Sequence, residues 1–125
     1  MSAVRLGIRD NQTAFRPGEF VEGAALWELD AAPDLAELRL VWSTRGKGTE
    51  DSEVVSTQTF AEPKPGDTRS FKFQLPDSPY SFNGQLIALI WALELVVKPG
   101  DHFARVEIII APEGREIVLP SLGKS

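Results

Sequence analysis

Hydrophobic and polar residues alternate along several short stretches of this chain, and this period of two limits the fold more than any other feature. The alternation runs through residues 4–9, 37–42, 71–75 and 105–110. Successive side chains of a β-strand point to opposite faces of a sheet, so a strand with one face on a core has this pattern. No segment of helical length carries apolar residues at the spacing of one helix face. Further strands are expected at residues 20–29, 53–60, 85–97 and 116–119.

Turn signals separate the expected strands. Three stretches share the order basic, Pro, Gly, acidic: residues 16–19, 64–67 and 98–101. Pro fixes φ at the first central position of a turn and Gly accepts the positive φ of the second, which predicts type II turns. Asn83-Gly84 predicts another turn, and the polar stretch 44–51 predicts a hairpin tip. The short stretch 32–38 contains Pro33 and is expected to lead into a strand.

The spacing of these elements indicates the fold class. About seven to eight short strands between regular turns are typical of an all-β, immunoglobulin-like antiparallel β-sandwich. A closed barrel is the alternative. No linker or low-complexity segment interrupts the pattern, so residues 1–125 are expected to form a single domain.

The composition excludes several classes of function. The 125-residue chain has a formal net charge of −5 and no cysteine, which excludes disulfides, thiolate metal sites and cysteine nucleophiles. No run of Lys or Arg is present, so neither nucleic acid nor an anionic membrane surface is expected as a partner. The longest apolar stretch, residues 86–97, is shorter than the roughly 20 residues of a membrane span, so no membrane insertion is expected. Because residues 1–10 lack the pattern of a signal peptide, a cytoplasmic location is expected.

Residues that could carry catalysis are few. His102 is the only histidine in the chain, and it follows Asp101 directly after a turn. A serine triad or a zinc site needs companions that a lone histidine does not have. No catalytic residue, metal ligand or cofactor is therefore predicted, and the chain is not expected to be an enzyme.

One loop, residues 44–53, gathers charges of both signs. Three acidic residues lie close to Arg45 and Lys47: Glu50, Asp51 and Glu53. Calcium sites take several oxygen ligands from one or two loops, although this spacing does not match the EF-hand loop. The loop supports an alternative hypothesis, a carbohydrate- or metal-binding β-sandwich domain, including one associated with a hydrolase. Arg45 and Lys47 are also candidates for contacting an anionic group on a partner.

The expected strand 85–97 is apolar on both faces. Its odd-numbered residues are expected to face the core, because Glu94 lies on the even-numbered face. The candidate partner-binding stripe on the even-numbered face consists of Leu86, Ala88, Ile90 and Ala92. Exposed apolar stripes often mark interfaces. A loop or terminus of the same chain over this stripe is the alternative.

Two stretches resemble a known family. Residues 15–23 read Phe-Arg-Pro-Gly-Glu-Phe-Val-Glu-Gly and resemble the opening Y-R-P-G-E-x-V-x-G of arrestin N-terminal-like domains. Residues 71–84 read Phe-Lys-Phe-Gln-Leu-Pro-Asp-Ser-Pro-Tyr-Ser-Phe-Asn-Gly and resemble the F-x-F-x-L-P…P-x-S-F-x-G stretch of the same domains. The resemblance covers residues 3–111. Members of this family include arrestins, the arrestin-like subunit of retromer and bacterial sporulation-control proteins.

The resemblance implies an immunoglobulin-like sandwich that acts as an adaptor or scaffold. It also implies structural roles for the residues of a turn, a close strand approach and a crossing between strands: Pro17, Gly18, Gly23, Pro76, Pro79, Phe82 and Gly84. The relatives generally carry two sandwiches in tandem, whereas this chain has room for one. We therefore expect a non-catalytic interaction module that binds an unknown protein partner, or a second copy of itself, through a sheet face or edge.

Overall fold

The computed structural model describes residues 3–46, 51–83, 87–99, 102–112 and 117–118. The elements follow one another as β1 (Ala3–Ile8), the 3-10 turn η1 (Arg9–Asn11), β2 (Ala14–Phe15), β3 (Phe20–Glu28), β4 (Leu35–Gly46), β5 (Ser52–Thr59), β6 (Gly66–Gln74), β7 (Phe82–Asn83), β8 (Ile87–Lys98), β9 (His102–Ile110) and β10 (Ile117–Val118). Strands thus dominate the described residues, and seven of them are six residues long or longer, which confirms the all-β prediction.

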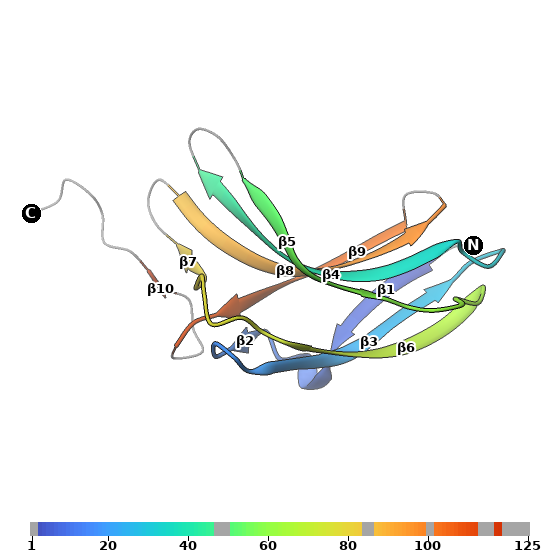
Figure 1. The fold of residues 1–125 in the computed structure, drawn as a ribbon, viewed down its shortest axis with the longest axis horizontal. Helices are drawn as coiled ribbons and strands as arrows, with labels where there is room; N and C mark the ends of the chain where they lie inside the picture. The colour runs from blue at the N-terminus through green and yellow to red at the C-terminus, as the bar shows by residue number, and fades with distance from the viewer. Residues whose placement is uncertain (1–2, 47–50, 84–86, 100–101, 113–116, 119–125) are drawn as a thin grey trace, which may run out of the picture.

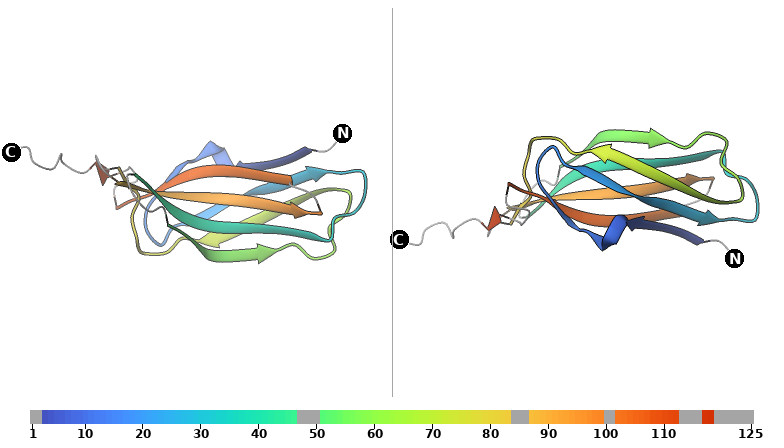
Figure 2. Two further views of the ribbon diagram at one scale, coloured as in Figure 1. Left: turned by 90° about the horizontal axis from the view of Figure 1, so that it is seen from above. Right: turned by 90° about the horizontal axis from the view of Figure 1, so that it is seen from below.

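The strands form two facing sheets (Figure 1). The smaller sheet has the order β1-β3-β6, and all its pairs are antiparallel. The larger sheet has the order β10-β7-β8-β4-β5, with β9 paired to β8 and the short β2 paired to β9. Figure 2 shows β9, β8, β4 and β5 side by side from one side, and β1, β3 and β6 from the other. The sandwich is therefore the predicted one, except that two short pairs, β2 with β9 and β10 with β7, are parallel.

The core lies between the two sheets and follows the alternation in the sequence. Trp27 of β3 and Trp91 of β8 are its two largest fully buried side chains. Each indole donates to a loop carbonyl: Trp27 Nε1 to Lys64 O at 2.7 Å and Trp91 Nε1 to Pro79 O at 2.9 Å. A buried indole contributes a large apolar area to the core, and the hydrogen bond of its N–H group fixes the orientation of the ring. The two tryptophans therefore fix the loops that flank β6 to the core.

The odd-numbered face of β8 is turned toward the core, as expected. Its odd-numbered residues are at most 6% exposed: Leu89, Trp91, Leu93, Leu95 and Val97. The side chain of Ile87 lies outside the described part. The strand β4 begins at Leu35, so the Pro33 stretch does lead into a strand, and β4 pairs with β5 as the predicted hairpin.

The three Pro-Gly stretches differ from one another. The first is the predicted turn, since Gly18 has φ of +78° and Glu19 N donates to Arg16 O at 3.1 Å. In the second stretch, Gly66 is the first residue of β6 and has no positive φ, so the type II prediction was wrong there. In the third, the peptide bond before Pro99 is cis, which a type II turn does not have at its first central position.

Gly23 of β3 lies close to the backbone of β1 and to a side chain of β6. A Cβ atom added there would overlap the backbone oxygen of Gly7 and lie 2.7 Å from Phe71 Cζ. Real Cβ atoms essentially never make contacts this short. The structure therefore explains why this position holds glycine, the role that the family resemblance implied.

Residues 75–81 cross from the smaller sheet to the larger one, which is the crossing that the second motif implied. Pro76 and Pro79 lie in this segment, and Phe82 begins β7 and packs half-buried against the core. Gly84 lies outside the described residues. Ser81 closes the crossing, because its N–H donates to Ile110 O at 2.7 Å and its Oγ accepts from Ile110 N at 3.0 Å.

Candidate functional site

The edge strand β6 presents backbone groups that have no partner among the described residues. In an antiparallel pair, hydrogen-bonded and non-bonded residue pairs alternate. The ladder between β3 and β6 is bonded at both ends, with Leu75 N donating to Glu19 O and Leu29 N donating to Pro65 O. Because bonded and non-bonded pairs alternate between these two ends, Ser70 and Lys72 fall in non-bonded pairs. Their N–H and C=O groups therefore point away from β3. No described residue bonds to these outward groups.

The other long edges are less open. In β5 the register shifts between Leu40 and Val41 of its partner β4, so a β-bulge interrupts the edge near Val55. Bulges and short edges are devices by which proteins discourage pairing with further strands. The strand β1 packs beside β9 of the other sheet. Among the described strands, β6 is the long edge that is regular from end to end.

Charged side chains on β6 turn away from its open stretch. Lysine at a sheet edge usually blocks the approach of another strand. Here Lys72 Nζ reaches back over the sheet, 3.4 Å from Glu22 Oε1 and 4.6 Å from the centre of the Phe20 ring. Arg69 points the other way and donates to the carbonyl oxygens of Ala61 and Glu62. The edge from Ser70 to Gln74 is thus left accessible.

Asp67 closes the first end of the same edge. Its Oδ1 accepts from the backbone N–H of Thr68 at 2.9 Å, and its Oδ2 accepts from Arg69 Nε at 2.9 Å. Burial raises the pKa of the Asp67 carboxyl, but the hydrogen bonds from Arg69 and from the Lys64 and Thr68 N–H groups outweigh it and hold the pKa below its ordinary value. Asp67 is therefore ionised near neutral pH. Its carboxylate binds the Thr68 N–H, a donor that an added strand would otherwise use.

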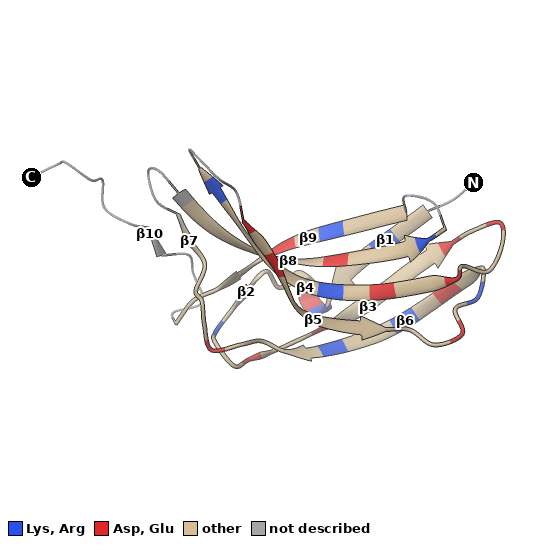
Figure 3. Ribbon diagram, turned by 45° about the horizontal axis from the view of Figure 1, so that its top comes forward, with Lys and Arg blue, Asp and Glu red and all other residues tan. Residues whose placement is uncertain are grey.

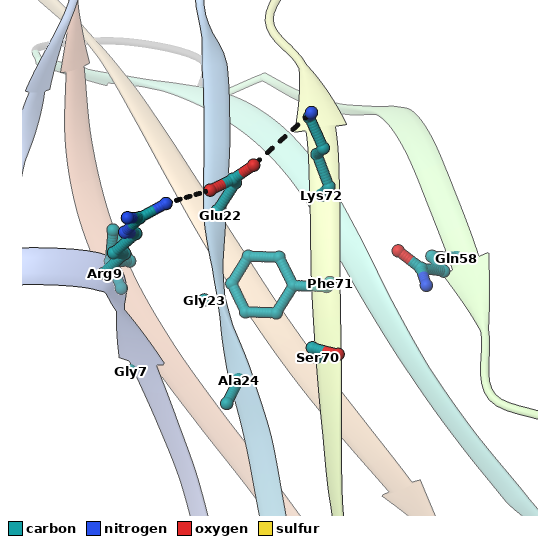
Figure 4. A pocket seen from close by; sticks show the side chains of 10 residues that line it. Gly7, Arg9, Glu22, Gly23, Ala24, Gln58, Ser70, Phe71 and Lys72 are labelled. Atoms are coloured by element: carbon teal, nitrogen blue, oxygen red, sulfur yellow. Dashed lines mark hydrogen bonds and ion pairs between the residues drawn. The ribbon is translucent and has the colours of Figure 1, made fainter.

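A shallow hollow of about 780 Å³ adjoins the open stretch (Figure 4). It borders Ser70, Phe71 and Lys72 of β6, residues 22–24 of β3, the end of β1, and Gln58 of β5. On the outer face of the smaller sheet, Gly7, Ala24 and Ser70 are in register and form a row of small side chains. Taller residues flank this row on both sides, so it forms the floor of a trough across the three strands.

One wall of the trough is the row of Arg9, Glu22 and Lys72. Arg9 Nη1 lies 3.0 Å from Glu22 Oε2, so both cations share one carboxylate, as the dashed lines in Figure 4 show. The hydrogen bonds from Arg9 and Lys72 hold the pKa of the Glu22 carboxyl below its ordinary value. The other wall is the row of Arg5, Leu26 and Thr68.

The outer face of the larger sheet carries a different charge pattern. Lys and Arg alternate with Asp and Glu across β4, β8 and β9 in Figure 3. Most of these charges are paired: Glu37 with Arg39, Glu94 with Arg105, Arg105 with Glu107, and Arg45 with Glu107. This face is therefore internally neutralised around β8.

The predicted apolar stripe lies on that face and is only partly open. Ala88 and Ile90 are half-buried, whereas Ala92 has no exposed surface, so the expectation of an exposed residue was wrong there. Its neighbours on β4 and β9 are Val41 and Glu107, whose side chains cover so small a residue. Leu86 lies outside the described residues. A role for this stripe in partner binding stays a prediction.

The charged loop after β4 is described only in part. Lys47 and Glu50 lie outside the described residues, and Arg45 is paired with Glu107. A small hollow of about 250 Å³ adjoins Arg45, Asp51 and nearby serine and threonine residues. Within the described ranges no three acidic or histidine side chains are close enough to hold a metal ion. Ligand binding at this loop stays a prediction.

His102 is half-buried at the first residue of β9, opposite Val97 of β8. The sequence pattern did not identify the β6 edge or Ser81. A strand edge depends on the order of strands in the sheet, which residue types do not specify. The adjacent Ser81 and Phe82 of the second motif contained the signal, but the resemblance implied roles for the prolines and the phenylalanine and none for the serine.

Comparisons with known proteins give a fold and no family. No family model matches the chain, and no curated protein sequence matches it. The structure is similar to that of Spo0M, a sporulation control protein from Bacillus subtilis, with a TM-score of 0.64 and 16% identity over 88% of this chain. The chain spans 49% of the length of Spo0M. At this identity the likeness shows the fold alone, and it agrees with the resemblance of the two motifs.

Two weaker similarities involve parts of larger proteins. The alkylpurine DNA glycosylase AlkC of Pseudomonas fluorescens has a TM-score of 0.47 and 11% identity over 88% of this chain, which spans 30% of that protein. A β-glucosidase from Listeria innocua has a TM-score of 0.43 and 12% identity over 95% of this chain, which spans 16% of that enzyme. Among the described residues, no helix has the length and hydrophobicity to cross a membrane.

Proposed function

We propose that this chain is a non-catalytic protein-interaction module of the arrestin-like type, which binds an extended segment of a partner protein as an added strand on β6. The observation that carries the proposal is the regular edge around Ser70 and Lys72, whose outward N–H and C=O groups have no partner among the described residues. Strand addition uses such groups for affinity and takes specificity from alternate side chains.

The surroundings of the edge support this mode of binding. The similarity of the fold to that of Spo0M, a sporulation control protein, is compatible with a regulatory module. The hydrophobic side chains of β6, Phe71 and Phe73, are buried beneath the sheet, so the edge is held rigidly by the core. A rigid, preformed edge lowers the entropic cost of binding an extended segment.

A pair of proline variants tests the proposal. In Ser70→Pro the lost N–H points away from β3, so the fold keeps its own hydrogen bonds and an added strand loses one donor. Thr57→Pro is the matched control, because the Thr57 N–H points outward from the other edge strand, β5. Circular dichroism and thermal melts establish that both variants fold.

Binding is measured with peptides selected from a random display library against the immobilised wild-type chain. The proposal expects peptides whose affinity falls at least tenfold for Ser70→Pro and is unchanged for Thr57→Pro. It also expects the amide protons of Ser70 and Lys72 to become protected from hydrogen exchange when a peptide binds. Peptides that bind both variants as tightly as the wild type, or a library that yields no peptide, would refute the proposal.

A further inference from the structure

Given the proposed function, on which this inference rests, the side chains beside the β6 edge determine the chemistry of the segment that it binds. We infer that the β6 edge selects an antiparallel strand with the order acidic, any residue, aromatic, in which the acidic side chain lies opposite Lys72 and the aromatic ring lies opposite Ser70. The antiparallel direction sets this order, because the partner residue opposite Lys72 comes before the one opposite Ser70. Both side chains then lie on the outer face of the sheet.

The aromatic preference follows from the floor of the trough. Ser70 is exposed, and the next residues in its row, Ala24 and Gly7, have little or no side chain. No atom lies within 4 Å of where a Cβ of Gly7 would be, so the floor is open at its far end too. A ring opposite Ser70 can lie sideways over Ser70 and Ala24 and bury apolar area, as aromatic side chains do beside small cross-strand neighbours.

The acidic preference follows from the charges of the walls. Three cations, Arg5, Arg9 and Lys72, line the trough against one carboxylate, Glu22. A further acid, Asp10, has its Oδ2 4.0 Å from Arg9 Nε and is largely exposed. Arg5 forms no ion pair or hydrogen bond with the described residues.

This local excess of positive charge contrasts with the rest of the molecule. The whole chain carries a formal charge of −5, and the charges on the outer face of the larger sheet pair with one another. An acidic residue opposite Lys72 forms a favourable cross-strand pair, whereas a basic residue there meets like charge. The same contrast of charge orients an acidic segment toward the smaller sheet rather than the larger one.

Three labelled peptides test this selection by fluorescence anisotropy. The reference is fluorescein-Thr-Val-Glu-Val-Trp-Val-Thr-amide, and the other two replace its Glu by Lys or its Trp by Ala. Cross-strand pairs contribute about 0.2–1 kcal/mol each, which corresponds to a loss of roughly 1.4- to fivefold in affinity per replacement. The loss for the lysine peptide should be larger and should shrink at high salt.

Variants of the protein show which of its residues cause the preference for Glu and for Trp in the peptide. Ala24→Leu fills the floor and should remove the preference for Trp, with Ala3→Leu on the same outer face as the control. Lys72→Gln should remove the preference for Glu, with Lys98→Gln as a control of equal charge change. Ala24→Val provides a smaller obstruction if Ala24→Leu does not fold.

Each other outcome has a definite meaning. Peptides that lose binding to Ser70→Pro but show no preference for Glu or Trp overturn this inference and leave the proposed function intact. Peptides that bind Ser70→Pro normally overturn both. A concentration-dependent dimer of the wild type that Ser70→Pro abolishes identifies a second copy of the chain as the occupant, which also overturns the inference.

Discussion

Arg45 of β4 donates from Nη2 to Glu107 Oε2 of β9 at 2.8 Å, across the outer face of the intervening strand β8. The register places Arg45 beside Ala88 and Glu107 beside Ala92, so the ion pair spans β8 diagonally. Ile90, the outer-face residue of β8 between Ala88 and Ala92, is half-buried. The pair therefore covers part of a surface that the sequence alone presents as an exposed apolar stripe.

The two faces of β8 should respond differently to truncation. Leu93→Ala removes a side chain with no exposed surface and should lower the free energy of unfolding by about 2–5 kcal/mol. Ile90→Ala, on the half-buried outer face, should cost only about 1 kcal/mol. Urea denaturation measures both. Equal losses would mean that the outer face of β8 is as tightly packed as the core.

Two glycines form a matched pair for the close approach of β1 and β3. Gly23→Ala adds a methyl group that overlaps Gly7 O and the Phe71 ring, and should cost about 3 kcal/mol or more because backbone must move. Gly7→Ala meets nothing within 4 Å and should change stability by less than about 1 kcal/mol, with stabilisation possible through the unfolded state. A tolerated Gly23→Ala would contradict the strand spacing described above.

Ser81 should matter far more than its neighbour Ser78. Ser81→Ala leaves the buried N–H of Ile110 without its acceptor and should lower the free energy of unfolding by about 1–3 kcal/mol. Ser78→Ala changes an exposed side chain in the same crossing and should stay within about 0.5 kcal/mol. Chemical denaturation of both variants, together with hydrogen exchange at Ile110, tests the assignment.

Glu22 should make stability depend on pH. Because its folded-state pKa is lowered by Arg9 and Lys72, the unfolded state binds its proton more readily. Its contribution is therefore complete above the ordinary glutamate pKa of about 4.3 and disappears as the pH falls through the lowered folded value. Glu22→Gln should be less stable than the wild type at pH 7 and equally stable well below pH 4.

The control for this pH effect is Glu28→Gln, which changes an exposed carboxylate farther along β3. It removes a carboxylate from the same strand and keeps the contacts of Glu22 with Arg9 and Lys72. Thermal melts between about pH 2 and pH 7 provide the comparison. A difference between Glu22→Gln and the wild type that persists at the lowest pH would show that the ion pair is not its cause.

The strands and the core face of β8 could be predicted from the sequence because they depend on local alternation. The alternation around Phe71 and Phe73, for example, fixes which face of β6 is buried. The candidate site could not be predicted, because the open edge at Ser70 exists only when β6 is the outermost strand of its sheet. The burial of Ala92 was missed for a related reason, since its cover comes from other strands.

The turns show the same division between local and distant causes. Gly18 adopts the positive φ that its Pro-Gly pair predicts. Gly66, in the same local sequence pattern, is instead recruited into β6 by its pairing with Glu28. Tertiary pairing thus decides which of two similar turn sequences becomes a turn.

The parallel pairing of β2 with β9 imposes an order on how the chain can assemble during synthesis. Phe15 is 2% exposed and lies beside Ile110, which the ribosome adds long after Phe15. Until that residue has emerged, the phenylalanine has no site to occupy. A nascent chain lacking β9 therefore exposes a hydrophobic side chain of β2, and the sandwich closes only after β9 has been synthesised.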